Sequence, residues 1–170
     1  LPILNEHLSS SKWWDFGRKQ GGLYLFTPTV TAENSDWYRG TADAMYQNID
    51  FLKRRHEPYV IISSGDCVYK MDYNELLDYH IAKKADITVA CKDMPVDADV
   101  SRFGVVRMNE DARIVEFEEK PIIAQSNTIS TGVYVIRRRQ LIEILEKSAE
   151  ENRFDFVADV LIRYKNIKRI

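Results

Sequence analysis

A continuous apolar run at residues 59–62 ends directly in a polar turn at residues 63–66, and this junction constrains the fold more than any other feature. Uninterrupted apolar residues are typical of a strand that is covered on both faces. Before the run, residues 41–55 carry apolar side chains at steps of three and four, the spacing of one helical face. After it, Asp72 and Glu75 resemble a capping box that opens another helix. The local order is therefore helix, strand, helix.

The same alternation continues to the end of the chain. Residues 86–91 predict a second buried strand, residues 103–108 and 114–117 predict a hairpin, and residues 129–136 predict a further strand. Two helical patterns follow, with apolar positions at Leu141, Ile144, Leu145, Val157, Val160, Leu161 and Tyr164. Alternating strands and helices predict an α/β fold with a mostly parallel, mixed sheet and crossover connections.

Size and charge limit the class of protein. The 170 residues, 45% of them hydrophobic, suffice for one sizeable core, so residues 1–170 are expected to be one domain or part of one. A formal net charge of -2 shows no surplus of basic residues for nucleic acid or an anionic membrane. No apolar run approaches the roughly 20 residues of a membrane-spanning helix. A soluble, cytoplasmic protein is expected, with a small molecule or another protein as partner.

Two cysteines and three histidines offer little chemistry by themselves. Cys67 and Cys91 lie far apart without a CxxC pair, which argues against a disulfide scaffold and a zinc site. Both are interpreted as small buried hydrophobic residues. His80 lies on the apolar face of its predicted helix, where a core histidine is expected rather than a catalytic one.

Asp66 is the best single candidate for chemistry. It follows the first clear strand, and ligands of open α/β sheets gather where strands end. A carboxylate there could hold Mg²⁺, which prefers one or two carboxylates with water and phosphate oxygens completing its shell. The alternative is a turn aspartate that accepts hydrogen bonds from loop amides, and the spacing alone leaves both interpretations open.

Two further segments have a functional and an ordinary interpretation. Lys120 follows a predicted strand within residues 118–121, so it could direct a positive charge at a phosphate, or it could be a solvated charge at a strand end. Residues 37–44 place aromatics and a glycine before a helix start, where free amides could meet an anion or a base edge. The same residues also suit a plain helix start, because they lack the glycine spacing of a phosphate-binding loop.

Five strings in a fixed order resemble the glucose-1-phosphate adenylyltransferase family: WYRGTADAMYQN, SSGDCVYKMDY, SRFGVV, EFEEKP and STGVYVI. The resemblance extends over essentially the whole chain and includes the early EHLSSSKWWDFGRKQGG. It implies a Rossmann-like nucleotidyltransferase domain. In that family a glucose 1-phosphate oxygen attacks the α-phosphorus of ATP in line, and ADP-glucose and pyrophosphate form with the help of Mg²⁺.

Position by position, the resemblance implies roles for individual residues. Asp66 matches the catalytic, metal-binding aspartate, and Arg54 matches a position that contacts a regulator in some relatives. Five residues match positions that hold glucose 1-phosphate: Tyr38, Gly104, Glu119, Lys120 and Ser130. Three match positions that are expected to contact the nucleotide: Gly40, Thr41 and Gly65.

The chain departs from the catalytic pattern of that family. Catalytic members resemble GDHIY and DFGKD, where this chain has GDCVY at residues 65–69 and DFVAD at residues 155–159, so a histidine and a lysine are missing. This combination is similar to the GlgD-type subunit of glycogen synthesis, which modulates a catalytic partner in a hetero-oligomer, expected to be a tetramer. A catalytically competent subunit and another sugar-phosphate nucleotidyltransferase remain the alternatives. A glycosyltransferase of the GT-A type would be expected to show Asp-x-Asp, and residues 66–68 have a single carboxylate.

The resemblance also implies that the domain is incomplete at both ends. The glycine-rich loop of the family is expected before Leu1, and the second metal carboxylate and a left-handed β-helix are expected after Ile170. The chain by itself is therefore expected to be inactive, since half of the triphosphate site would lie outside it.

Overall fold

The computed structural model describes residues 2–9, 21–28 and 37–170. It divides into two units, Leu1–Trp37 and Tyr38–Ile170. The first unit contains helix α1 (Pro2–Ser9), and residues 21–28 there have no regular secondary structure. Much of the string EHLSSSKWWDFGRKQGG lies outside the described residues. Every site residue predicted from the sequence belongs to the second unit.

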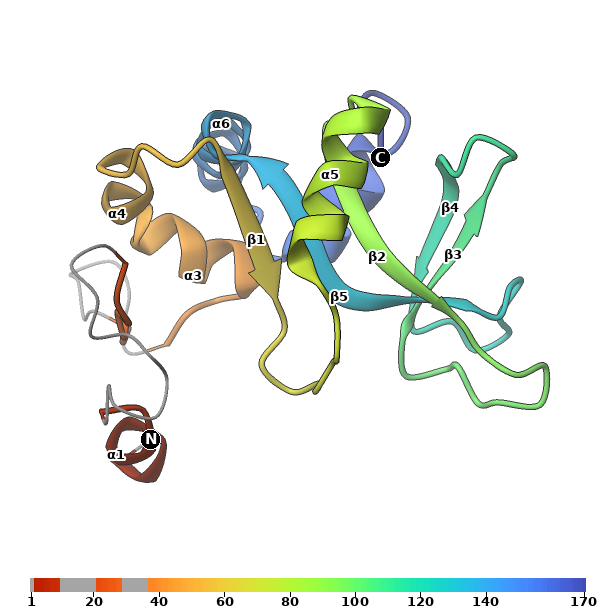
Figure 1. Ribbon diagram of the computed structural model, residues 1–170, viewed down its shortest axis with the longest axis horizontal. Coiled ribbons are helices and arrows are strands. Elements are labelled where there is room, and N and C mark those ends of the chain that lie inside the picture. The colour runs from red at the N-terminus through yellow and green to blue at the C-terminus, as the bar shows by residue number, and fades with distance from the viewer. Residues whose placement is uncertain (1, 10–20, 29–36) are drawn as a thin grey trace. The chain divides into compact units, whose positions relative to one another are not determined.

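The second unit is built on a five-stranded sheet with β5 (Thr128–Arg137) at its centre (Figure 1). One edge of β5 pairs with β1 (Tyr59–Ser63), and the other pairs with β2 (Ile87–Asp93). The hairpin of β3 (Gly104–Met108) and β4 (Ile114–Glu119) joins the sheet near the start of β5, where Val105 pairs with Ile129. The α/β class and all five predicted strands are confirmed.

The predicted mostly parallel orientation is wrong for the strand pairs of the described residues. Both β1 and β2 are antiparallel to β5, and the pairs β3–β4 and β3–β5 are antiparallel as well. The strands β1 and β2 do run in the same direction and are joined through helix α5 (Tyr73–Lys83). They are not neighbours, however, because β5, which comes later in the chain, lies between them. Sequence order predicts crossovers but not which strand is inserted between two others.

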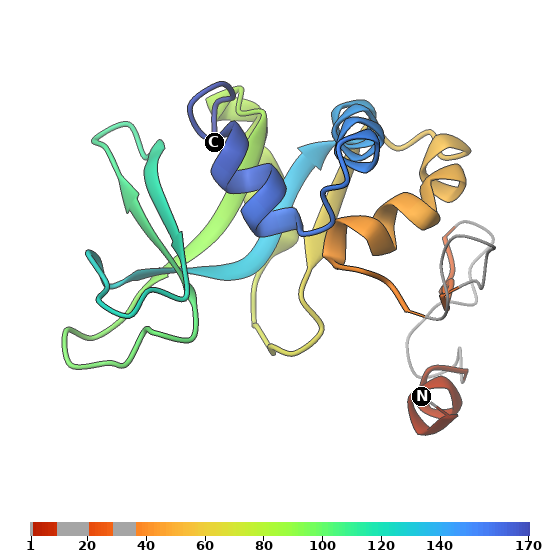
Figure 2. The same cartoon turned by 180° about the vertical axis from the view of Figure 1, so that it is seen from behind.

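Helices cover both faces of the sheet. Figure 1 shows α5 in front of the sheet, and Figure 2, from behind, shows the π-helix η1 (Val157–Ile162) over β5. Helix α6 (Arg138–Glu150) contacts α3 (Thr41–Gln47), α4 (Ile49–Lys53) and η1. None of the helices within the described ranges is long and apolar enough to span a membrane.

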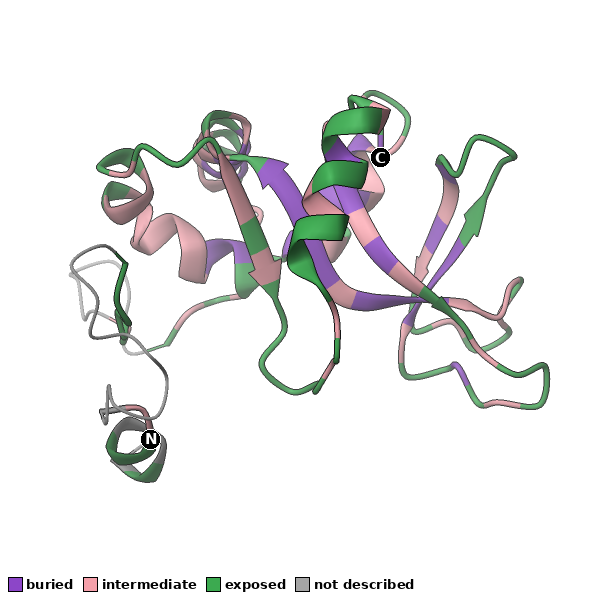
Figure 3. Cartoon of the chain, viewed as in Figure 1, coloured by how far each residue is buried: buried purple, intermediate pink, exposed green. Residues whose placement is uncertain are grey.

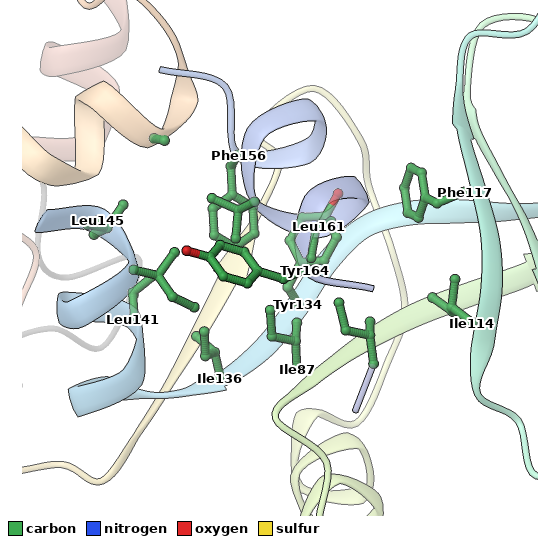
Figure 4. Packing of buried hydrophobic residues seen from close by; sticks show 14 of the residues in the cluster. Ile87, Ile114, Phe117, Tyr134, Ile136, Leu141, Leu145, Phe156, Leu161 and Tyr164 are labelled. Carbon is green, nitrogen blue, oxygen red and sulfur yellow. The ribbon is translucent and has the colours of Figure 1, made fainter. Parts of the chain in front are cut away.

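The main core forms between β5 and the helices behind it (Figure 4). Tyr134 and Ile136 of β5 pack there with Leu141 of α6 and with Phe156 and Leu161 around η1. Figure 3 shows that most of β5 is buried, as expected of a central strand with covered faces. A smaller cluster, Val100, Val105 and Ile129, lies at the hairpin.

A local signal identified the start of α5, whereas the helix predicted at residues 41–55 is divided and α1 was not predicted. Asp72 is the N-cap of α5, and its carboxylate accepts a hydrogen bond of 2.8 Å from the Asn74 amide, as the capping pattern predicts. The predicted helix at residues 41–55 is instead divided at Asn48 into α3 and α4. The Asn48 side-chain amide donates to the Ala44 carbonyl at 2.8 Å and to the Tyr38 hydroxyl at 3.1 Å. These side-chain bonds compete with regular helical bonding at that position.

His80 is a buried core residue, as predicted. It is 1% exposed, its Nδ1 lies 2.7 Å from the Thr88 hydroxyl, and the edge of its ring meets Tyr59. Within the described part of the chain its Nε2 has no hydrogen-bond partner. Burial lowers the pKa of His80 below its ordinary value of 6.5, and the Arg137 charge lowers it further, while Asp86 acts in the opposite direction.

Protonation of His80 should therefore destabilise the fold. Because the unfolded chain binds the proton more tightly, the contribution of neutral His80 is fully present above pH 6.5 and is lost as the pH falls through the folded-state pKa. Urea unfolding between pH 7.5 and 5 should show a falling free energy of unfolding, with a flatter profile for His80→Gln. Exposed His56→Gln is the control, and its profile should follow that of the unsubstituted protein. A His80→Gln profile as steep as the control would contradict this assignment.

Candidate functional site

The polar turn after β1 lies beside an irregularity in the centre of β5. Ala90 of β2 pairs with Val133, but its neighbour Cys91 pairs with Ser130, so residues 131 and 132 are additional residues on β5. We call residues 130–133 the β5 bulge. The Ser64 amide donates a hydrogen bond of 3.0 Å to the Gly132 carbonyl. This bond places the turn that carries Asp66 against the β5 bulge.

Gly132 is a glycine for two reasons that concern this contact. Its φ is +74°, a left-handed conformation that L side chains rarely adopt. A Cβ atom there would lie 3.1 Å from the Ser64 Cβ. The bulge is held by the buried Thr131 hydroxyl, which donates to the Ala90 carbonyl at 2.8 Å, and by the Gly132 amide, which donates to the Ser130 hydroxyl at 3.3 Å.

Asp66 lies fully exposed in the loop of residues 64–72, which we call the Asp66 loop. Its carboxylate accepts a short hydrogen bond from the Ser64 hydroxyl. That bond is the main cause that lowers the pKa of Asp66, and the nearby Lys120 charge contributes to the same shift. An exposed carboxylate that stays ionised can bind a cation.

Glu119 and Lys120 end β4 next to the first residue of β3. Gly104 pairs with Glu119, and the Lys120 amide donates to the Phe103 carbonyl at 3.1 Å. Lys120 has a φ of +49°, and its Nζ lies 3.6 Å from the Glu119 Oε1. A Cβ atom on Gly104 would lie 2.8 Å from the Phe117 ring and 3.1 Å from the Glu119 carboxylate. The glycine therefore leaves space for the carboxylate, and the 65% exposed lysine side chain can reach a ligand.

Tyr134 lies directly after the β5 bulge, and sequence reasoning did not single it out. Its hydroxyl lies 3.5 Å from the buried Ser130 hydroxyl. Burial is the main cause that raises the pKa of Tyr134, the hydrogen bond with Ser130 lowers it, and the Glu119 charge raises it. Ser130 and Tyr134 lie four positions apart in one predicted strand, and residues at this spacing point to the same face of a sheet. This spacing could have identified Tyr134 as a neighbour of Ser130.

Tyr69 also contacts the β5 bulge, and sequence reasoning did not single it out. Its hydroxyl donates a short hydrogen bond to the Thr131 carbonyl in the β5 bulge. Burial raises the pKa of Tyr69 to about 12, and Cys67, Asp66 and Tyr134 add to this effect. Cys67 is exposed in the same loop, so the prediction that it is buried is wrong, while Cys91 is half-buried. No sequence pattern distinguishes Tyr69 from the other tyrosines, because its partner is 62 residues away.

The first turn of α3 is occupied by backbone from the other end of the chain. The amides of Ala42 and Asp43 donate to the Phe154 carbonyl at 2.8 and 3.2 Å, and the Phe156 amide donates to the Thr41 hydroxyl at 3.0 Å. A Cβ atom on Gly40 would clash with the Phe154 carbonyl oxygen. Gly40 and Thr41 thus have a packing role, and their contact with a nucleotide stays a prediction.

Of the remaining predicted residues, one lies in the Asp66 loop and two lie near the ends of α4. Gly65 is exposed in the Asp66 loop, and a Cβ atom there would have open space around it to a distance of 4 Å. Tyr38 is half-buried, and its hydroxyl bonds to Asn48 before α4. Arg54 is exposed just after α4, and its Nε donates to the Asp50 carbonyl at 3.1 Å. Arg54 lies before the first residue of β1 and Asp66 lies after its last residue. The two side chains are therefore at opposite ends of this strand.

Among the residues that the structure describes, no group of three or more histidine, cysteine, aspartate or glutamate side chains could enclose a metal ion. Asp66 offers an exposed carboxylate in the loop after β1. A single protein carboxylate fits Mg²⁺ in sites where water and phosphate oxygens supply the other ligands. A cavity of about 720 Å³ lies between α5, β2, the turn after β3 and Ile170; Met71 and Asp72 at the end of the Asp66 loop border it, and no predicted site residue lines it.

Comparison with known proteins shows the family of the chain. A family model described as "Nucleotidyl transferase" matches residues 2–167. The chain is 43% identical over 163 residues to a glucose-1-phosphate adenylyltransferase of Thermotoga maritima, across 95% of this chain and 38% of that relative. It is 42% identical over 170 residues to one of Thermosipho melanesiensis, across 99% and 41% of the two chains. For one of Lachnospira eligens the identity is 43% over 168 residues, across 98% and 40%. The chain spans about two fifths of the length of these curated relatives.

Proposed function

The chain belongs to the nucleotidyl transferase family, and from this premise we propose that it is part of a glucose-1-phosphate adenylyltransferase of glycogen synthesis. The proposed reaction joins ATP and glucose 1-phosphate to ADP-glucose and pyrophosphate. The observation that carries the proposal is the identity of 42–43% to enzymes of that name over nearly the whole chain, with Asp66 after β1 and Lys120 after β4. Since both substrates are water-soluble metabolites, we propose a cytoplasmic location.

In this proposal the side chains of the site bind and orient the two substrates. Lys120 would hold the phosphate of glucose 1-phosphate through charge-assisted hydrogen bonds, and Glu119 would accept sugar hydroxyls. Ser130, Gly104 and Tyr38 would complete the sugar-phosphate pocket. Displacement at phosphorus depends mainly on positioning and charge neutralisation, so no covalent nucleophile is required.

The nucleotide would bind beside the Asp66 loop. Gly65, Gly40 and Thr41 are the proposed contacts on this side. Asp66 would hold Mg²⁺, which when bound neutralises charge on the phosphates. The lowered pKa of Asp66 supports this role, because the carboxylate remains ionised and able to bind a cation.

We further propose that the protein is a modulatory subunit of the GlgD type. The support is the replacement of the family's histidine by Cys67 and the sequence Val157-Ala158 where catalytic members have glycine and lysine. The Ala158 amide donates a 2.7 Å bond to the Asp155 carboxylate, and the residue carries only a methyl side chain. Its side chain cannot neutralise a phosphate. In this proposal the partner is a catalytic subunit of the same family in a hetero-oligomer, expected to be a tetramer, and exposed Arg54 contacts a regulator.

Synthesis of ADP-glucose by the protein in its full length tests the subunit assignment. Alone, it should turn over far more slowly than its catalytic partner, and mixing the two should change the rate or the regulator response of the partner. If the full-length protein alone turns over at the rate of the partner, the modulatory role is contradicted. The alternative of a catalytically competent subunit would then be supported, in agreement with the presence of Asp66, Glu119 and Lys120.

Replacement of Lys120 tests the sugar-phosphate pocket. Lys120→Ala should weaken glucose 1-phosphate binding about 5- to 150-fold, because one charge-assisted contact with the phosphate is lost. Isothermal titration calorimetry measures this affinity directly. Lys147→Ala, on the exposed side of α6, is the matched control and should bind normally. Equal affinities for the two variants would remove Lys120 from the pocket.

A further inference from the structure

The Asp66 loop contacts the rest of the protein through few side chains. Between Ser64 and Asp72 only Tyr69 and Met71 are not exposed. Around Asp66 the loop has little support: a Cβ atom on Gly65 would meet nothing within 4 Å, and Val68 is fully exposed. The conformation of the loop tip therefore depends on what holds its two sides.

Two hydrogen bonds connect the loop to the β5 bulge, one on each side of Asp66. On the first side the Ser64 amide donates to the Gly132 carbonyl, and on the second side the Tyr69 hydroxyl donates to the Thr131 carbonyl. The two acceptors are consecutive residues of β5. The loop is thus closed over residues 65–68 by a pair of bonds to one short segment.

The acceptor of the Tyr69 bond is itself held in place. Thr131 is buried, and its side chain donates to the Ala90 carbonyl of β2. Ser130, directly before it, is buried against Tyr134. The hydrogen bond from Tyr69 therefore connects the Asp66 loop to the central strand of the sheet. Its acceptor, Thr131, is next to Ser130, a residue of the proposed sugar-phosphate pocket.

We propose that Tyr69 is a positioning residue whose hydroxyl holds the Asp66 loop on the β5 bulge and so places the Asp66 carboxylate for cation binding. The inference rests on the proposed function of Asp66. Without the bond, residues 65–68 would be held on one side only, and ordering them on ligand binding would cost conformational entropy.

The first experiment measures loop order without any metal. Tyr69→Phe keeps the aromatic ring and removes only the hydroxyl bond. Backbone ¹⁵N relaxation should give order parameters of about 0.85 for Asp66 and Cys67 in the unsubstituted chain. In Tyr69→Phe both values should fall below about 0.6. Tyr73→Phe, an exposed tyrosine at the start of α5, is the matched control and should leave both values unchanged. Equal order in the two variants would overturn the proposal.

The second experiment asks whether the ordered loop serves the cation. Mn²⁺ binding to the folded protein, followed by electron paramagnetic resonance, should be roughly 2- to 10-fold weaker in Tyr69→Phe and normal in Tyr73→Phe. A more mobile loop with unchanged Mn²⁺ affinity would overturn the positioning role. If Asp66→Asn binds Mn²⁺ as well as the unsubstituted protein, the proposed function of Asp66 fails, and the relaxation data still decide whether Tyr69 holds the loop.

Discussion

The Asp66→Asn protein should bind Mn²⁺ at least about 100-fold more weakly than the unsubstituted protein. Replacement of residues that merely orient a metal ligand commonly costs 10- to 100-fold in affinity, and this substitution removes the charge of the ligand itself. In the described part of the chain Asp66 belongs to no group of three or more potential metal ligands, so its own charge should matter strongly for cation binding. Asparagine keeps the shape of the side chain and its capacity to accept the Ser64 hydrogen bond.

Mn²⁺ titration followed by electron paramagnetic resonance measures this loss, with Mn²⁺ as the probe for the Mg²⁺ site. Asp97→Asn is a suitable control, because Asp97 is an exposed aspartate in the loop between β2 and β3. Its Mn²⁺ affinity should equal that of the unsubstituted protein. A similar affinity for Asp66→Asn would show that Asp66 does not bind the cation, and the interpretation of a turn aspartate would then hold.

The Phe156→Ala protein should lose about 3–5 kcal/mol of its free energy of unfolding. Phe156 is 2% exposed, and its ring lies 5.4 Å from the Tyr134 ring in the main core. Truncation removes buried apolar surface and leaves a cavity between β5 and the helices behind it (Figure 4). This loss is a large fraction of the stability of an ordinary domain.

Urea unfolding followed by circular dichroism measures the change. Ile122→Ala is the control, since Ile122 is 99% exposed and its truncation should change stability by less than about 0.5 kcal/mol. Because Phe156 supports Tyr134 next to Ser130, the folded fraction of Phe156→Ala should also bind glucose 1-phosphate more weakly. A loss of stability as small as that of the control would show that the core around Phe156 is not packed as described.

Local patterns predicted the elements of this fold, and long-range pairing decided their arrangement. The apolar run at residues 59–62 became β1, and Asp72 became the N-cap of α5, because burial and capping depend on neighbouring residues. The parallel orientation was predicted wrongly because β5 lies between β1 and β2. The sequence of a single strand does not determine which strands will be its neighbours in the sheet.

Some residues of the site were predicted from the sequence, and others were found only in the structure. Asp66 and Lys120 became candidates through their positions after strands, and the resemblance implied their roles; the structure shows that Asp66 follows β1 and Lys120 follows β4. Tyr69 and Tyr134 were missed because their roles depend on the β5 bulge and on carboxylates distant in sequence. A tyrosine in a strand or a loop is ordinary until its partner is known.

The sequence by itself determined the order of strands and helices, the polar residues at the strand ends and the resemblance to a sugar-nucleotide-forming family, because each depends on residue types at short spacing. Only the tertiary structure decided that β5 lies between β1 and β2 and that the turn after β1 lies against a bulge in β5. The physical reason is that hydrogen bonds between strands connect backbone atoms, which are alike in every residue. Pairing and register follow from how the whole set of side chains packs.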